Sequence, residues 1–179
     1  MAFKKHIADG SMHVWALLRI TLGYIFLWAF FDKLFGLGFS TCRDKVTDVI
    51  SGGCSQSWAH GGSPTEGFLG NAVTGPFADF YHNLAGQAWV DWLFMVGLLV
   101  IGLGLLLGIW VRFAAFAGIA MMLLMWSALL WPANSPGVDE HIIYAIVLFG
   151  IAMVDENQVW GLRAWWLKTR LAKAVPFLR

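Results

Sequence analysis

The chain has 179 residues, of which 59% are hydrophobic and only 13% are charged, and its formal net charge is +1. Soluble domains are usually about 45–50% apolar and about 25% charged, so this composition excludes an ordinary soluble globular protein. We expect one integral membrane domain over residues 1–179 and no nucleic-acid partner.

Four apolar segments approach the roughly 20 helical residues that cross the hydrocarbon core of a bilayer. They are Trp15–Phe39, Val90–Trp110, Phe113–Trp131 and the shorter Val138–Val154. Such runs in lipid are helices, because a helix satisfies its own backbone hydrogen bonds. A turn at Gly108–Arg112 joins the second and third segments into a hairpin. The expected fold is therefore all-α, a bundle of four transmembrane helices.

The basic residues indicate how the bundle is oriented, because Lys and Arg favour the cytoplasmic side of a membrane. The segment between the first two spans, residues 40–89, carries only Arg43 and Lys45 against four acidic residues. We therefore expect a multi-pass protein of the inner (plasma) membrane, with both termini in the cytoplasm and residues 40–89 as a long exterior loop. The other basic residues that support this are Lys4, Lys5, Arg112, Arg163, Lys168, Arg170, Lys173 and Arg179.

The exterior loop contains both cysteines of the chain, Cys42 and Cys54. An oxidising compartment and an even count predict a disulfide between them. A redox-active thiol pair is the alternative, although such pairs usually have the C-x-x-C spacing. Further along, the stretch GPFADFYHNLAG (75–86) predicts a short helix with Pro76 in its first turn. It either lies on the membrane surface or covers the bundle as an ordinary loop helix.

The C-terminal tail, residues 158–179, combines an apolar stripe with flanking basic residues. The stripe consists of Trp160, Ala164, Leu167, Leu171 and Ala174. This pattern is typical of an amphipathic helix at the membrane interface that binds anionic lipid. Membrane lipid is thus one expected partner of the chain.

Several ionisable residues lie within or beside the predicted spans, where they are functional candidates by default. Arg19 and Lys33 are fourteen residues apart, which places them about 21 Å apart along a helix and within about 40° of the same face. Asp32 is turned about 100° away from Lys33, so the two reach different neighbours. Asp91, Asp139, Glu140 and His141 open other spans at the same outer level. The pattern predicts a polar pocket at the exterior end of the bundle.

The catalytic candidates in this pocket are Lys33, Asp32, His141 and Asp91. Alternatively, Lys33 extends to the interface and the acids favour helix N-termini. The candidates for binding a cofactor are Arg19, Trp28, Arg112 and Trp126, which alternatively meet lipid headgroups or pack in the bundle. We expect no metal site.

Three stretches resemble the DoxX/DoxD family of small four-span membrane proteins. RITLGYIFLWAFFDKLFG resembles its first span, with an Arg, a Gly-aromatic centre and a Lys near the end. WVDWLFMVGLLVIGLGLLLGIWVRFAAFAGIAMM resembles its helical hairpin, and DEHIIYAIVLFGIAMV resembles its last span. The long loop with GPFADFYHNLAG is similar to the DoxD branch, the large membrane subunit of thiosulfate:quinone oxidoreductase.

The resemblance implies oxidation of thiosulfate outside the cell, reduction of a membrane quinone, and a small DoxA-like partner subunit. In such a reaction Lys33 and His141 would hold an anion or protonate a quinone oxygen, while Asp32 and Asp91 would carry protons. The sequence has no flavin or haem motif to carry electrons. A non-catalytic anchor or assembly subunit of a larger redox complex is therefore the main alternative, and a homo-oligomer also fits. A transporter ranks last, because no broken-helix pair is evident.

Overall fold

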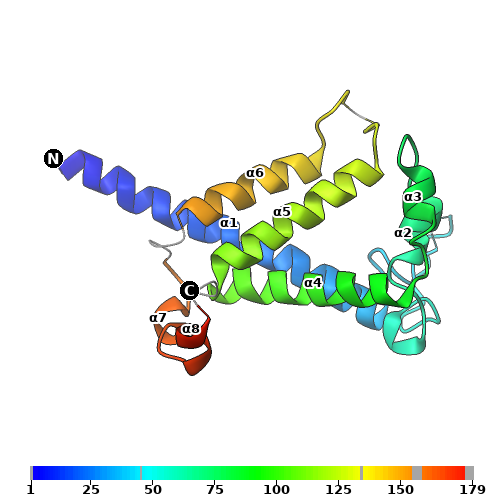
Figure 1. Cartoon of the computed structure of the whole chain (residues 1–179), viewed down its shortest axis with the longest axis horizontal. Helices are drawn as coiled ribbons and strands as arrows, with labels where there is room; N and C mark the ends of the chain where they lie inside the picture. Colours follow the sequence, from blue (N-terminus) through cyan, green and yellow to red (C-terminus); the bar gives the residue numbers. More distant parts are fainter. Residues whose placement is uncertain (1, 45, 134, 155–158, 176–179) are drawn as a thin grey trace. The chain divides into compact units, whose positions relative to one another are not determined.

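A computed structural model describes residues 2–44, 46–133, 135–154 and 159–175, with side chains from Gly10 onward (Figure 1). Lys45 and Arg179, which entered the orientation argument, lie outside the described residues, as do tail residues 158 and 176–179.

Four long helices make up most of the described chain: α1 (Ala2–Phe35), α4 (Ala88–Leu107), α5 (Val111–Ala128) and α6 (Glu140–Met153). Short helices lie in the first loop and in the tail: η1 (Trp58–His60), α2 (Glu66–Asn71), α3 (Ala78–His82), α7 (Arg163–Trp166) and α8 (Arg170–Ala174). One isolated antiparallel bridge, Arg43 to Ile50, is the β-structure found in the described residues. The all-α prediction is confirmed.

In the part of the chain that the structure describes, three helices are long and apolar enough to cross a membrane: Gly10–Phe35 of α1, all of α4 and all of α5. The fourth predicted span, 138–154, forms the 14-residue helix α6. At about 1.5 Å per residue, α6 is about 21 Å long, short of the roughly 30 Å of hydrocarbon in a bilayer. Among the described residues, three of the four predicted spans therefore have the length of a membrane-crossing helix, and the bundle of four transmembrane helices is not confirmed.

The chain divides into two compact units. The first consists of Met1–Ile25, Val100–Leu123 and Glu140–Arg179, and the second of Phe26–Leu99 and Leu124–Asp139. Helices α1, α4 and α5 each contribute residues to both units, which are described separately below.

Glycines allow close helix packing in the first unit. A Cβ added at Gly23 of α1 would lie 2.5 Å from the backbone nitrogen of Leu106 in α4. Gly150 of α6 similarly leaves room for the ring of Trp15, and Gly118 of α5 for the side chain of Leu148. Such small residues let helix backbones approach one another in membrane proteins, where dispersion contacts drive association.

In the second unit, α2 and α3 pack on the end of α5 through Leu69, Val73, Tyr81 and Ala128. The Tyr81 hydroxyl bonds to the Leu124 carbonyl at 3.1 Å and to the Ser127 hydroxyl at 2.6 Å. The helix predicted in GPFADFYHNLAG is thus present, although it begins only at Ala78. Tyr81 is buried, while Phe77 and Phe80 are exposed.

The single amphipathic helix predicted for the tail is instead two short helices, α7 and α8. Thr169 adopts an extended conformation between them, with φ −69 and ψ 154. Its hydroxyl accepts the Ala172 N–H at 3.2 Å and so caps the second helix. An N-cap residue has non-helical backbone angles, so the threonine that caps α8 also prevents α7 from continuing into it.

The close contact at Gly23 gives a direct test of helix packing. We expect Gly23→Ala to lower the free energy of unfolding by about 1–3 kcal/mol, because the new methyl group overlaps the backbone of α4. Gly10→Ala is the matched control, since no atom lies within 4 Å of its added Cβ. Because alanine favours helix, this control should be neutral or stabilising by up to about 1 kcal/mol. Unfolding in detergent, followed by circular dichroism, measures both, and equal stability of the two variants would contradict the packing described.

Candidate functional site

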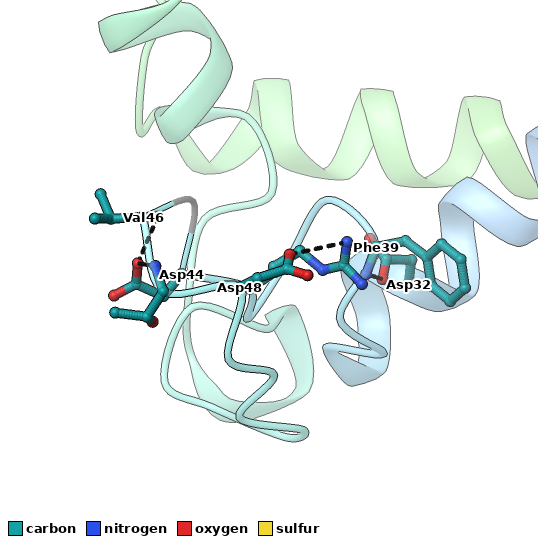
Figure 2. A network of polar contacts seen from close by, with 7 residues as sticks. Asp32, Phe39, Asp44, Val46 and Asp48 are labelled. Atoms are coloured by element: carbon teal, nitrogen blue, oxygen red, sulfur yellow. Dashed lines mark hydrogen bonds and ion pairs between the residues drawn. The ribbon is translucent and has the colours of Figure 1, made fainter.

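Asp32 anchors the chain that leaves α1. Its side chain is 1% exposed and accepts the backbone N–H groups of Phe39, Ser40 and Thr41 at 3.0, 2.9 and 3.1 Å. Figure 2 shows Asp32 together with Phe39. The Ser40 hydroxyl donates a fourth hydrogen bond at 2.7 Å. The chain can return to Asp32 because Gly36, at φ +68, ends the helix in the left-handed region that glycine favours. Four donors match the roughly four lone-pair sites of an ionised carboxylate.

Lys33 lies in the next position and shares Ser40 with Asp32. Its Nζ donates to the Ser40 hydroxyl oxygen at 3.1 Å and lies 5.9 Å from the centroid of the Phe94 ring. The hydroxyl therefore links the two charged residues, which do not pair directly by a hydrogen bond in the described residues. An ammonium group has three N–H donors, so Lys33 retains donors beyond the one that Ser40 accepts. Its side chain is half-buried.

Asp91 holds the other end of the same loop. It lies in the first turn of α4, is 6% exposed, and accepts the Ser63 hydroxyl at 2.8 Å. Thr65 donates both its hydroxyl and its backbone N–H to the same carboxylate. The hydrogen bonds of Asp91 therefore attach the loop to the start of α4.

The predicted disulfide between Cys42 and Cys54 is present, with an S–S distance of 2.03 Å. It closes a hairpin-like turn in which Arg43 and Asp48 form an ion pair at 3.3 Å (Figure 2). Within this turn the backbone N–H groups of Thr47 and Val46 hold the pKa of the Asp44 carboxyl below its usual value. The first loop is therefore fixed at three places: by Asp32, by the disulfide and by Asp91.

A shallow cavity of about 250 Å³ lies beside the disulfide. It is lined by polar groups and the two sulfur atoms, from Cys42, Arg43, Asp44, Ser51, Cys54, Ser55 and Gln56. Ligand pockets are usually about 300–1,000 Å³ and mostly apolar. At about 250 Å³, this cavity is smaller than such pockets.

His141 is the fourth catalytic candidate and lies in the first turn of α6, where it is 8% exposed. It belongs to the first unit, whereas the other three candidates, Asp32, Lys33 and Asp91, belong to the second. With its chain neighbours Asp139 and Glu140 it offers three ligand atoms within 4.8 Å of one another. Acidic residues are common at helix starts, where they interact favourably with the helix dipole, so we assign no metal site there.

Arg19 is completely buried in the first unit and donates to main-chain carbonyls. Its Nη1 bonds to the carbonyls of Leu105 and Leu106 in the last turn of α4. Its Nη2 bonds to those of Val159 and Trp160, at 3.1 and 2.9 Å, in the segment before α7. The guanidinium thus supplies donors that a helix C-terminus lacks, and a favourable charge for its dipole.

The remaining cofactor candidates have separate partners. Trp28 makes an edge contact with Phe39, with ring centroids 5.0 Å apart. Trp126 donates its indole N–H to the Gly137 carbonyl at 3.0 Å, and Arg112 is exposed in the first turn of α5. The contacts of Trp28 and Trp126 thus pack a ring and attach a loop within the second unit.

The sequence did not predict which loop residues donate hydrogen bonds to the buried carboxylates, namely Ser40, Ser63 and Thr65. A usable signal was present at Ser63 and Thr65, which flank Pro64, because small hydroxyl residues next to glycine or proline often bond to nearby backbone and acidic groups. No protein-family model, curated protein or solved structure matches this chain.

The Asp32 contacts predict a stability effect that is confined to one loop. We expect Asp32→Ala to cost about 1–3 kcal/mol, because the N–H groups of residues 39–41 lose their acceptor. Hydrogen exchange at these amides should accelerate. The matched control is Asp48→Asn, which removes an ion pair whose carboxylate side chain is 80% exposed and keeps a residue type that tolerates its φ of 57. This control should cost less than about 1 kcal/mol. Unchanged exchange in Asp32→Ala would contradict the role assigned to the carboxylate.

Proposed function

We propose that the chain is a DoxX/DoxD-like membrane subunit of a complex that oxidises thiosulfate or a related sulfur compound and reduces a quinone. In this proposal its own part is to anchor and assemble the complex. The supporting observation is that the two buried acids of the first loop, Asp32 and Asp91, are occupied by loop donors.

A general base needs a lone pair within reach of the proton that it removes. Asp32 and Asp91 are less than a tenth exposed and each accepts several hydrogen bonds from its own loop. Their hydrogen bonds, together with the Cys42–Cys54 disulfide, fix the loop backbone. A loop fixed in this way is suited to present a constant surface to another protein. If the loop faces the exterior, as the basic residues indicate, that protein would be a small DoxA-like subunit.

The second candidate function places the quinone chemistry in this chain, and Lys33 favours it. The ammonium group has donors to spare, is partly accessible and lies beside the Phe94 ring. A cation next to an aromatic ring could hold a sulfur oxyanion or a quinone oxygen. The two candidate functions therefore differ in the role of Lys33, which binds substrate or quinone in the second and takes no part in the reaction in the first.

The deciding experiment is purification of the complex in mild detergent, with identification of bound proteins and quinones and an assay of thiosulfate-dependent quinone reduction. Under the anchor proposal a partner protein co-purifies, and Lys33→Met keeps the rate within about twofold. Lys168→Met, an exposed lysine of the tail, is the matched control. A rate loss of more than about tenfold in Lys33→Met alone, about 1.4 kcal/mol in the barrier, would establish the second candidate instead. Recovery of neither a partner nor a quinone would contradict both.

A further inference from the structure

The tail is fastened to the turn between α4 and α5. The Leu162 N–H donates to the Leu107 carbonyl, the last residue of α4, at 2.8 Å. Trp166 and Ala172 are buried together with Ile109 of the turn. The rings of Trp166 and Trp110 also meet edge to face, with centroids 4.9 Å apart. These contacts fix α7 and α8 at the level where two candidate membrane helices end and begin.

The segment that leads into α7 is held to the same place by Arg19. One nitrogen of its guanidinium bonds to the end of α4, and the other bonds to the carbonyls of Val159 and Trp160. The backbones of Gly108 and Gly161 touch beside it, since a Cβ added at Gly108 would lie 2.8 Å from the Gly161 Cα. The tail is therefore part of the folded first unit.

The surface that the tail leaves exposed has two components. Large apolar side chains are exposed by about half or more, at Trp160 (60%), Leu162 (49%), Trp165 (62%) and Leu171 (54%). Lys168, Arg170 and Lys173 are also exposed, and the sequence from Val159 to Val175 contains no acidic residue. Exposed tryptophans together with basic residues are typical of protein surfaces at the membrane–water interface.

We propose that this tail surface, residues 159–175, binds the headgroups of anionic lipids at the bilayer surface where α4 ends and α5 begins. The basic side chains match the negative charge of the lipid, and the exposed tryptophans and leucines enter the boundary between headgroups and acyl chains. The positions of Leu107 and Val111 set the depth, because each lies at the end of a candidate membrane span. The proposal is independent of the function proposed above.

The test uses the full chain with an environment-sensitive dye on Ala174→Cys, an exposed position at the end of α8. The native cysteines are joined to each other, so they do not react with the dye in the absence of reductant. The protein is reconstituted into vesicles of phosphatidylcholine, with or without phosphatidylglycerol. We expect the emission to shift to the blue when phosphatidylglycerol is present, and high salt to reverse the shift by screening.

The triple variant Lys168→Gln, Arg170→Gln and Lys173→Gln should lose the response to phosphatidylglycerol. The matched control, Lys168→Arg with Lys173→Arg, keeps the charge and should retain the response. Unfolding midpoints in detergent establish that the variants compared are folded. An identical emission of the labelled wild type in both vesicles would overturn the proposal, as would a full response in the folded triple variant.

Discussion

Backbone polar groups near the hydrocarbon of a membrane must find partners within the protein, and buried charges of this chain supply them. Arg19 donates to the carbonyls at the end of α4, where a helix leaves acceptors unused. Asp32 and Asp91 do the reverse and accept N–H groups of the loop between α1 and α4. The sign of each charge suits the backbone groups that it meets.

This use of charge changes how the polar residues are interpreted. Burial of an ionisable group in a membrane segment usually suggests a site for substrate or protons. Here Arg19, Asp32 and Asp91 hold the chain where it enters or leaves a helix. The first loop bonds to the two acids, and the segment before α7 bonds to Arg19. Lys33 is the exception, since its ammonium group is partly accessible and keeps donors that its Ser40 contact does not use. Lys33 and the buried His141 therefore stay candidates for the chemistry of the chain.

The sequence predicted the apolar helices, which depend on composition, and the disulfide, which depends on two residues. Apolar run length identified α4 and α5, and the shared loop of Cys42 and Cys54 predicted their disulfide. It did not predict that α1 begins at Ala2, because polar residues outside a bilayer do not stop a helix. The break of the tail at Thr169 was also missed, since an apolar stripe at helical spacing does not reveal a cap within it.

The partners of the buried charges were the least predictable part of the site. Their identity depends on how a loop rich in glycine and serine returns to the helices, and helical periodicity carries no information about that path. The spacing of Asp32 and Lys33 predicted that they reach different neighbours, which is wrong, because both bond to the Ser40 hydroxyl. Likewise, nothing in the spacing around Arg19 pointed to the distant carbonyls of Val159 and Trp160.

The most direct test of this account is the stability and tail proteolysis of Arg19→Met, which keeps much of the side-chain volume but removes the donors. The account predicts a loss of about 3–5 kcal/mol of unfolding free energy, because buried carbonyls at the end of α4 and before α7 lose a charged partner. It also predicts faster cleavage of the tail in the folded protein. Arg170→Met, at an exposed position of the same unit, is the control, and with chymotrypsin as the protease it should change neither quantity appreciably. If Arg19→Met matched this control in stability and in tail cleavage, the buried guanidinium would not hold the unit together as described.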